Sequence, residues 1–157
     1  ATALGTGDDE LWAAARAIMA DAARDISADG TLPRERARGS RALHYHGFSV
    51  MPVVILAELG AVRGEDWYAL GDGAVHRLAA VTLRGFAEPE LFALLTGAPV
   101  APKAEPGSGW YQLYVRRFPG RAPAAPRRID PGHRWIGGDA LLLGDVLARM
   151  ALAQRPQ

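Results

Sequence analysis

The sequence contains no cysteine, and only Lys103 among its 18 basic residues is a lysine. Without cysteine the fold cannot depend on a disulfide, and a cysteine nucleophile is excluded. The remaining basic residues are arginines, whose planar guanidinium binds carboxylates through two parallel hydrogen bonds. A genomic bias toward arginine, alanine and glycine is the simpler explanation for most of them. The excess of arginine is nevertheless compatible with an acidic ligand.

Bulk charge and long apolar runs are also scarce. The net charge of +1 gives no case for a nucleic-acid partner, and no apolar run approaches the roughly 18 residues that span a bilayer. We therefore expect neither nucleic acid nor membrane as a partner. The length of 157 residues suits one domain. Because the chain starts at Ala1 and its first residues resemble the end of a helix, we expect a piece of a longer protein.

Helical spacing of apolar residues dominates the chain, and no alternating strand pattern has any strength. The sequence therefore predicts an all-α fold. Turn residues at 60–73 and loops rich in proline and glycine at 97–109 and 119–131 separate the helices, and the aromatic segment 110–118 is compatible with either helix or strand. The predicted helices cover about residues 8–26, 40–61, 74–86, 88–95 and 138–152.

The stretch 29–59 combines titratable groups with a strongly apolar run. It opens with the turn Asp29-Gly30 and continues into a nearly uniform apolar helix that contains Pro52. Charged groups next to a core must be paired or face a cleft, so this stretch is the first place to look for chemistry. Four arginines precede the apolar run: Arg34, Arg36, Arg38 and Arg41.

Arg38 and Tyr45 are seven residues apart, which on one continuous helix is nearly two turns and places both on one face. A guanidinium beside a phenol favours the phenolate, and such a tyrosine can act as a base near neutral pH. The alternative is a core tyrosine and an unrelated surface arginine. Gly39-Ser40 weakens the assumption of one continuous helix.

Other site types find little support. His44 and His46 lie two residues apart, so a helix directs them to different sides, whereas zinc-binding pairs are about four apart. We therefore predict no metal site. A glycoside hydrolase would need two carboxylates facing one cleft, and the spacing of Glu35, Glu58 and Asp66 suggests no such pair.

The string Asp29-Gly30-Thr31-Leu32-Pro33, with Arg38 and Arg41-Ala42-Leu43-His44-Tyr45-His46, resembles the mannuronate-specific alginate lyases of the α/α-toroid type. Weaker similarity extends to both sides of this string. It includes Asp8–Ala14, Asp72–Leu78 and the turn Trp135-Ile136-Gly137-Gly138.

The resemblance implies that residues 1–157 are the C-terminal portion of an incomplete (α/α) toroid built of helical hairpins. Such enzymes cleave by β-elimination, removing the C5 proton of a uronate while O4 leaves. Tyr45 falls on the catalytic tyrosine and Arg38 on the active-site arginine, and we expect Arg41 and His46 to bind substrate. No cofactor is implied. The resemblance also implies an acidic polysaccharide as substrate and a periplasmic or secreted location.

The family's Asn-Asn-His motif, which neutralises the substrate carboxylate and supplies a catalytic histidine, has no counterpart in these 157 residues. We therefore expect the isolated chain to be inactive and to require the missing N-terminal half of the toroid as its partner. The competing hypothesis is a non-catalytic helical module that binds an acidic polysaccharide or a partner protein.

Overall fold

The computed structural model describes residues 2–101, 109–121, 132–133 and 138–153. Nearly all regular structure in these ranges is helical, and a single antiparallel pair of two-residue strands joins Gly132↔Asp139 and His133↔Gly138. The elements in chain order are α1 (Thr2–Thr6), α2 (Asp9–Asp25), α3 (Pro33–Arg36), η1 (Gly39–Arg41), α4 (Ala42–Val62), η2 (Trp67–Ala69), α5 (Leu70–Ala87), α6 (Pro89–Thr96), α7 (Trp110–Arg117), β1 (Gly132–His133), β2 (Gly138–Asp139) and α8 (Ala140–Ala153).

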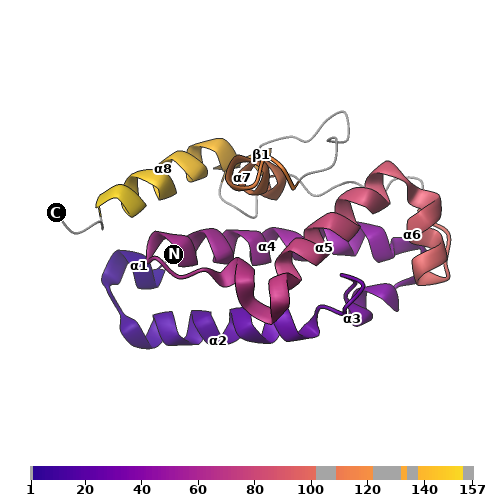
Figure 1. Cartoon of the computed structure of the whole chain (residues 1–157), viewed down its shortest axis with the longest axis horizontal. Helices are drawn as coiled ribbons and strands as arrows, with labels where there is room; N and C mark the ends of the chain where they lie inside the picture. Colours follow the sequence, from indigo (N-terminus) through magenta and orange to yellow (C-terminus); the bar gives the residue numbers. More distant parts are fainter. Residues whose placement is uncertain (1, 102–108, 122–131, 134–137, 154–157) are drawn as a thin grey trace.

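Helix α4 lies at the centre of the fold. In Figure 1, α2 runs along one side of α4 and α8 along the other, and both contact it, as do α5 and α7. A helix that is apolar on all sides is stable in water only when other elements surround it. Buried side chains cover most of α4, among them Val50, Met51, Val54 and Ala57. His44, Phe48 and Pro52 form an exposed stripe along its first half.

The segment 39–62 is long and apolar enough to cross a membrane by length and composition alone. This differs from our expectation that no run would approach that length. However, 56% of its 18-residue apolar window is buried inside the fold, which is typical of a core helix. Its apolar character is accounted for by the helices that pack on it.

Glu65 joins the start of the chain to the end of α4. Its carboxylate accepts hydrogen bonds from Trp12 Nε1 at 2.7 Å, Trp67 Nε1 at 2.8 Å and the Arg16 guanidinium at 2.6 and 2.8 Å. Chiefly because of the bond from Arg16, the pKa of Glu65 is lowered to about 2. The two indole rings pack with their centroids 5.0 Å apart. Helix α2 is thereby held against the turn that follows α4.

Helix α5 begins with a left-handed turn, since Gly71, Asp72 and Gly73 all have positive φ. The turn that the sequence predicts there is confirmed, although the helical segment starts earlier, at Leu70. The Arg77 guanidinium donates to the carbonyls of Gly71 at 3.0 Å and Asp72 at 2.5 Å, which stabilises the turn from within the helix. The backbone carbonyl of Arg77 in turn faces Gly30.

Gly30 is where the turn before α3 meets α5. Its φ is +83°, a conformation that side chains with a Cβ rarely adopt, and a Cβ at this position would collide with the Arg77 carbonyl and approach Val81. We expect Gly30→Ala to lower the free energy of unfolding by about 2 kcal/mol or more, as judged from urea denaturation. Gly64→Ala is the control, because its φ is also positive at +75° but nothing lies near its added Cβ. Equal losses in the two variants would contradict the proposed collision.

Most predicted helices are confirmed with small shifts in their ends. Helix α2 begins where expected because Asp8 caps it, accepting from the backbone N–H of Leu11 at 3.0 Å. Segment 110–118 is a helix rather than a strand, and the last helix starts at Ala140 rather than 138. The predicted loops at 97–109 and 119–131 lie largely outside the described residues, as does the turn Trp135–Gly137.

Candidate active site around Tyr45

The segment between Gly30 and α4 is organised by local capping. The Asp29 carboxylate accepts from the Thr31 backbone N–H at 2.9 Å and from the Thr31 hydroxyl at 2.7 Å, and these bonds lower the pKa of Asp29. Pro33 then occupies the first turn of α3, where its missing N–H costs nothing. Helix α3 ends at Arg36, and a 3₁₀ turn carries the chain into α4.

Arg38 and Tyr45 meet, but they do not share a helix. The Arg38 guanidinium carbon lies 3.9 Å from the centroid of the Tyr45 ring, a cation–π distance. Arg38 follows α3, whereas Tyr45 lies in the first turn of α4. The contact that the sequence predicts from helical spacing is therefore made across the 3₁₀ turn Gly39–Arg41, which separates Arg38 from α4. The arginine covers the ring face.

Two further charged residues surround this pair. The guanidinium carbon of the exposed Arg41 lies 5.8 Å from the same Tyr45 ring centroid. Glu35 Oε2 accepts from Arg38 Nε at 2.5 Å, and the Glu35 side chain is only 17% exposed. Arg38 is thus held between a carboxylate and an aromatic ring. Glu35 is not among the residues predicted to act with Arg38, although its three-residue spacing from Arg38 is a signal for a local ion pair.

His44 and His46 lie on opposite sides of Tyr45, as their spacing predicts. His44 is exposed, and its ring meets the Tyr45 ring edge-on with centroids 5.3 Å apart. His46 is completely buried. Its Nδ1 lies 2.8 Å from the Ala42 carbonyl, and its Nε2 accepts from the Leu32 backbone N–H at 2.9 Å. The expected substrate-binding role of His46 does not fit this placement, because both ring nitrogens are already bonded to backbone.

The three carboxylates considered for a hydrolase are all engaged in separate interactions. Glu35 binds Arg38, Asp66 caps η2 by accepting from the backbone of Tyr68 at 3.1 Å, and Glu58 is buried. Glu58 accepts from the Arg117 guanidinium at 2.6 and 2.8 Å and from the Tyr68 hydroxyl at 2.7 Å. The three carboxylates line three different cavities.

A second aromatic cluster was not foreseen. His76 Nδ1 lies 2.8 Å from the Tyr114 hydroxyl, and its ring stacks on Tyr68 with an interplanar angle of 17°. Burial lowers the pKa of His76 and raises that of Tyr114. The sequence separation of 38 residues between His76 and Tyr114 gave no signal for this contact. Within the described residues, no three histidine or carboxylate side chains lie close enough to hold a metal ion.

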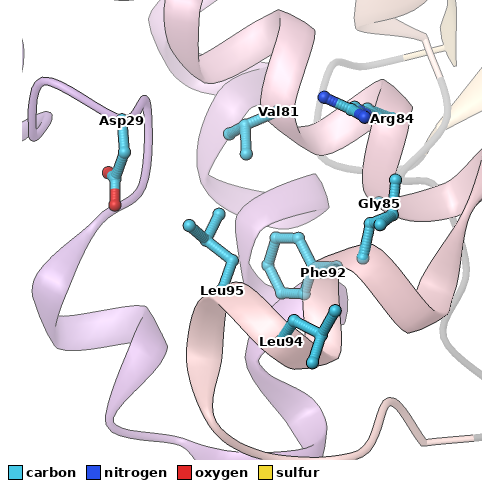
Figure 2. A pocket seen from close by; sticks show the side chains of 8 residues that line it. Asp29, Val81, Arg84, Gly85, Phe92, Leu94 and Leu95 are labelled. Carbon is cyan, nitrogen blue, oxygen red and sulfur yellow. The ribbon is translucent and has the colours of Figure 1, made fainter.

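Two cavities flank the segment that carries Arg38. One of about 310 Å³ lies between the end of α2, α3 and α4, and its lining includes Leu32, Glu35 and Ser49. The other, of about 490 Å³, lies between α5 and α6 and is shown in Figure 2, where Phe92 and Leu95 lie below Val81. Its lining is mostly apolar. The cavity beside Glu35 also has a lining that is more apolar than polar, with Asp25, Arg34, Glu35 and Ser49 as its polar side chains.

Comparison with known proteins gives a family match that includes the residues of this site. Residues 1–92, which include Arg38, Arg41 and Tyr45, match the alginate lyase family. A polysaccharide lyase of Stenotrophomonas maltophilia is 44% identical over 145 residues, covering 91% of this chain and 43% of that protein. An alginate lyase of Pseudomonas syringae pv. syringae is 32% identical over 121 residues, covering 75% of this chain and 32% of that protein.

An alginate lyase of Pseudomonas fluorescens is 28% identical over 153 residues, covering 96% of this chain and 40% of that protein. The chain thus spans less than half the length of each of these three relatives. Since the family match covers more than half of the chain, from α1 into α6, the chain belongs to the alginate lyase family.

Proposed function

We propose that this chain is the C-terminal part of an (α/α)-toroid lyase that cleaves polymannuronate by β-elimination. The observation that carries this proposal is the contact between Arg38 and Tyr45, with a guanidinium carbon 3.9 Å from the phenol ring centroid. Family membership supports the reaction class. The central apolar helix, surrounded by other helices, is compatible with one segment of a toroid.

In the proposed reaction Tyr45 serves as both base and acid. Its phenolate removes the proton from C5 of the uronate, the electrons of the C5–H bond form the C4=C5 double bond, and the C4–O4 bond breaks. The proton then passes from Tyr45 to the departing O4. One side chain can perform both transfers in mannuronate because the C5 proton and O4 lie on the same side of the ring. Tyr45 is half-buried, so part of its side chain is accessible to a substrate.

The charged neighbours of Tyr45 have distinct proposed roles. Arg38 offsets the negative charge that Tyr45 carries as a base, and the substrate carboxylate adds a second negative charge nearby. Arg41 is exposed and 5.8 Å from the ring centroid, so it can bind the carboxylate of a neighbouring sugar. Neutralisation of the carboxylate at the reacting sugar is assigned to an Asn-Asn-His motif in the remainder of the parent protein. The proposal includes no cofactor.

The parent is proposed to act in the periplasm or outside the cell, where an acidic polysaccharide is accessible. The N-terminal half of the toroid is the proposed partner of this chain, because it would form the other wall of the cleft. Loss of members of a cooperating catalytic set reduces rates by several powers of ten. We therefore expect the isolated chain to show no elimination.

The test follows the ultraviolet absorbance of the unsaturated uronate product while polymannuronate is incubated with the parent protein or with this chain alone. We expect the absorbance to rise with the parent only. A rise with this chain alone would contradict the proposal that the site is incomplete. No rise with either protein, together with retention of this chain on immobilised alginate, would replace the lyase by the polysaccharide-binding module. Polyguluronate in a parallel reaction tests the proposed specificity.

A further inference from the structure

The buried ring of His46 links two parts of the chain that surround the candidate site. Its Nε2 accepts from the backbone N–H of Leu32, just before α3, and its Nδ1 bonds to the carbonyl of Ala42, in the first turn of α4. Residues 32 and 42 are the two ends of the segment that carries Glu35, Arg38 and Arg41. The ring therefore closes this segment into a loop.

We propose that His46 is a positioning residue that holds Arg38 against Tyr45, an inference that rests on the function proposed above. The Leu32 carbonyl accepts from the backbone N–H groups of Glu35 at 3.0 Å and Arg36 at 2.9 Å. Fixing Leu32 thus fixes the first turn of α3. That turn presents Glu35, whose carboxylate binds Arg38, and Arg38 lies over the Tyr45 ring.

The two partners of His46 define its protonation state. A backbone carbonyl can only accept and a backbone N–H can only donate, so Nδ1 must carry the proton and Nε2 must be bare. Protonation of Nε2 would place two donors against each other at Leu32. His46 therefore performs its positioning role only as the neutral ring.

The surroundings of the ring favour this neutral form. His46 is completely buried, and α6 contributes the ring of Phe92, whose centroid lies 5.2 Å from that of the imidazole. The charged groups that face it are Asp29 and Glu35, which favour the protonated ring, and Arg36, which opposes it. Burial outweighs the two carboxylates and lowers the pKa of His46.

The pH dependence follows from that direction. The pKa of His46 is lower in the folded protein than the ordinary value of about 6.5, which applies to the unfolded chain. Below about pH 6.5 the unfolded chain therefore binds more protons than the folded protein. The stabilisation from the neutral ring is complete above about pH 6.5 and is lost progressively below it. The contact between Arg38 and Tyr45 should weaken once the ring takes up a proton in the folded protein, which its lowered pKa places below about pH 6.5.

The experiment detects the contact between Arg38 and Tyr45 by NMR on this chain and does not depend on enzyme activity. A guanidinium over an aromatic face shifts the Arg38 side-chain resonances upfield, and Tyr45→Leu identifies the shift by abolishing it. His46→Gln can still offer an acceptor to Leu32, whereas His46→Asn reaches only the Ala42 carbonyl. We expect His46→Gln to keep the upfield shift and His46→Asn to lose it. Val75→Ala, a core truncation in α5, is the control for general destabilisation and should keep the shift.

A folded His46→Asn chain that keeps the shift would overturn the proposal, as would a folded His46→Gln chain that loses it. If His46→Asn does not fold, acid titration of the unmutated chain decides. Loss of the Arg38 shift below about pH 6.5, before the far-ultraviolet circular dichroism changes, supports the proposal, and a shift that persists until unfolding refutes it. An inactive parent together with the expected NMR results would refute the lyase but not the positioning role.

Discussion

Replacing Tyr45 by phenylalanine is expected to reduce β-elimination by the parent protein about 10³-fold or more, because one hydroxyl is proposed to serve as both base and acid. Phenylalanine keeps the aromatic face over which the Arg38 guanidinium lies at 3.9 Å from the centroid. The substitution therefore removes the proton carrier and leaves the cation–π packing intact. The rate is measured as the initial increase in ultraviolet absorbance with saturating polymannuronate.

Tyr111→Phe is the matched control for this variant. Tyr111 is also half-buried, but it lies on α7, outside the Arg38 and Tyr45 segment. We expect removal of the Tyr111 hydroxyl to leave the elimination rate within about twofold of that of the unmutated parent, as for a surface change away from the chemistry. If Tyr45→Phe retained a similar rate, Tyr45 would have no part in proton transfer and the mechanism proposed above would be wrong.

The local parts of the fold could be predicted because the residues that determine them are neighbours in the chain. Asp8 caps α2 by accepting a hydrogen bond from the backbone N–H of Leu11, three residues later. The uniform apolar run after Ser49 predicts a central helix. The pairing of Arg38 with Tyr45 was also predicted, but from the wrong geometry. The prediction uses spacing along one helix, whereas α3 ends at Arg36 and the 3₁₀ turn Gly39–Arg41 lies between Arg38 and α4.

The parts that could not be predicted depend on contacts between distant residues. Glu65 receives bonds from Trp12 and Arg16, which lie 53 and 49 residues away. The burial of His46 was missed for a related reason. Its partners are backbone groups, and backbone groups are identical at every position, so residue identity gives no signal of which N–H and carbonyl a buried ring will find.

Arg117→Met is expected to cause the second large effect, a loss of about 3 kcal/mol in the free energy of unfolding. Arg117 binds both carboxylate oxygens of Glu58, at 2.6 and 2.8 Å. The Glu58 side chain is only 8% exposed, so removal of the guanidinium leaves a buried charge that still accepts from the Tyr68 hydroxyl. Because the Arg117 side chain is 40% exposed, water can partly replace it. The expected loss in the free energy of unfolding is therefore at the lower end of the range for buried ion pairs that lose one partner.

The double variant Glu58→Gln, Arg117→Met separates the buried charge from the loss of packing. Glutamine is neutral and its carbonyl can still accept from Tyr68, so the double variant should unfold at a higher urea concentration than Arg117→Met alone. Burial and the charge of Glu58 both raise the pKa of Tyr68, which keeps its hydroxyl available as the donor. If the double variant is less stable than the single one, the penalty comes from the lost contacts of the Arg117 stem between α4 and α7. If it is more stable, the bidentate pair exists to neutralise a carboxylate that the central helix places inside the core.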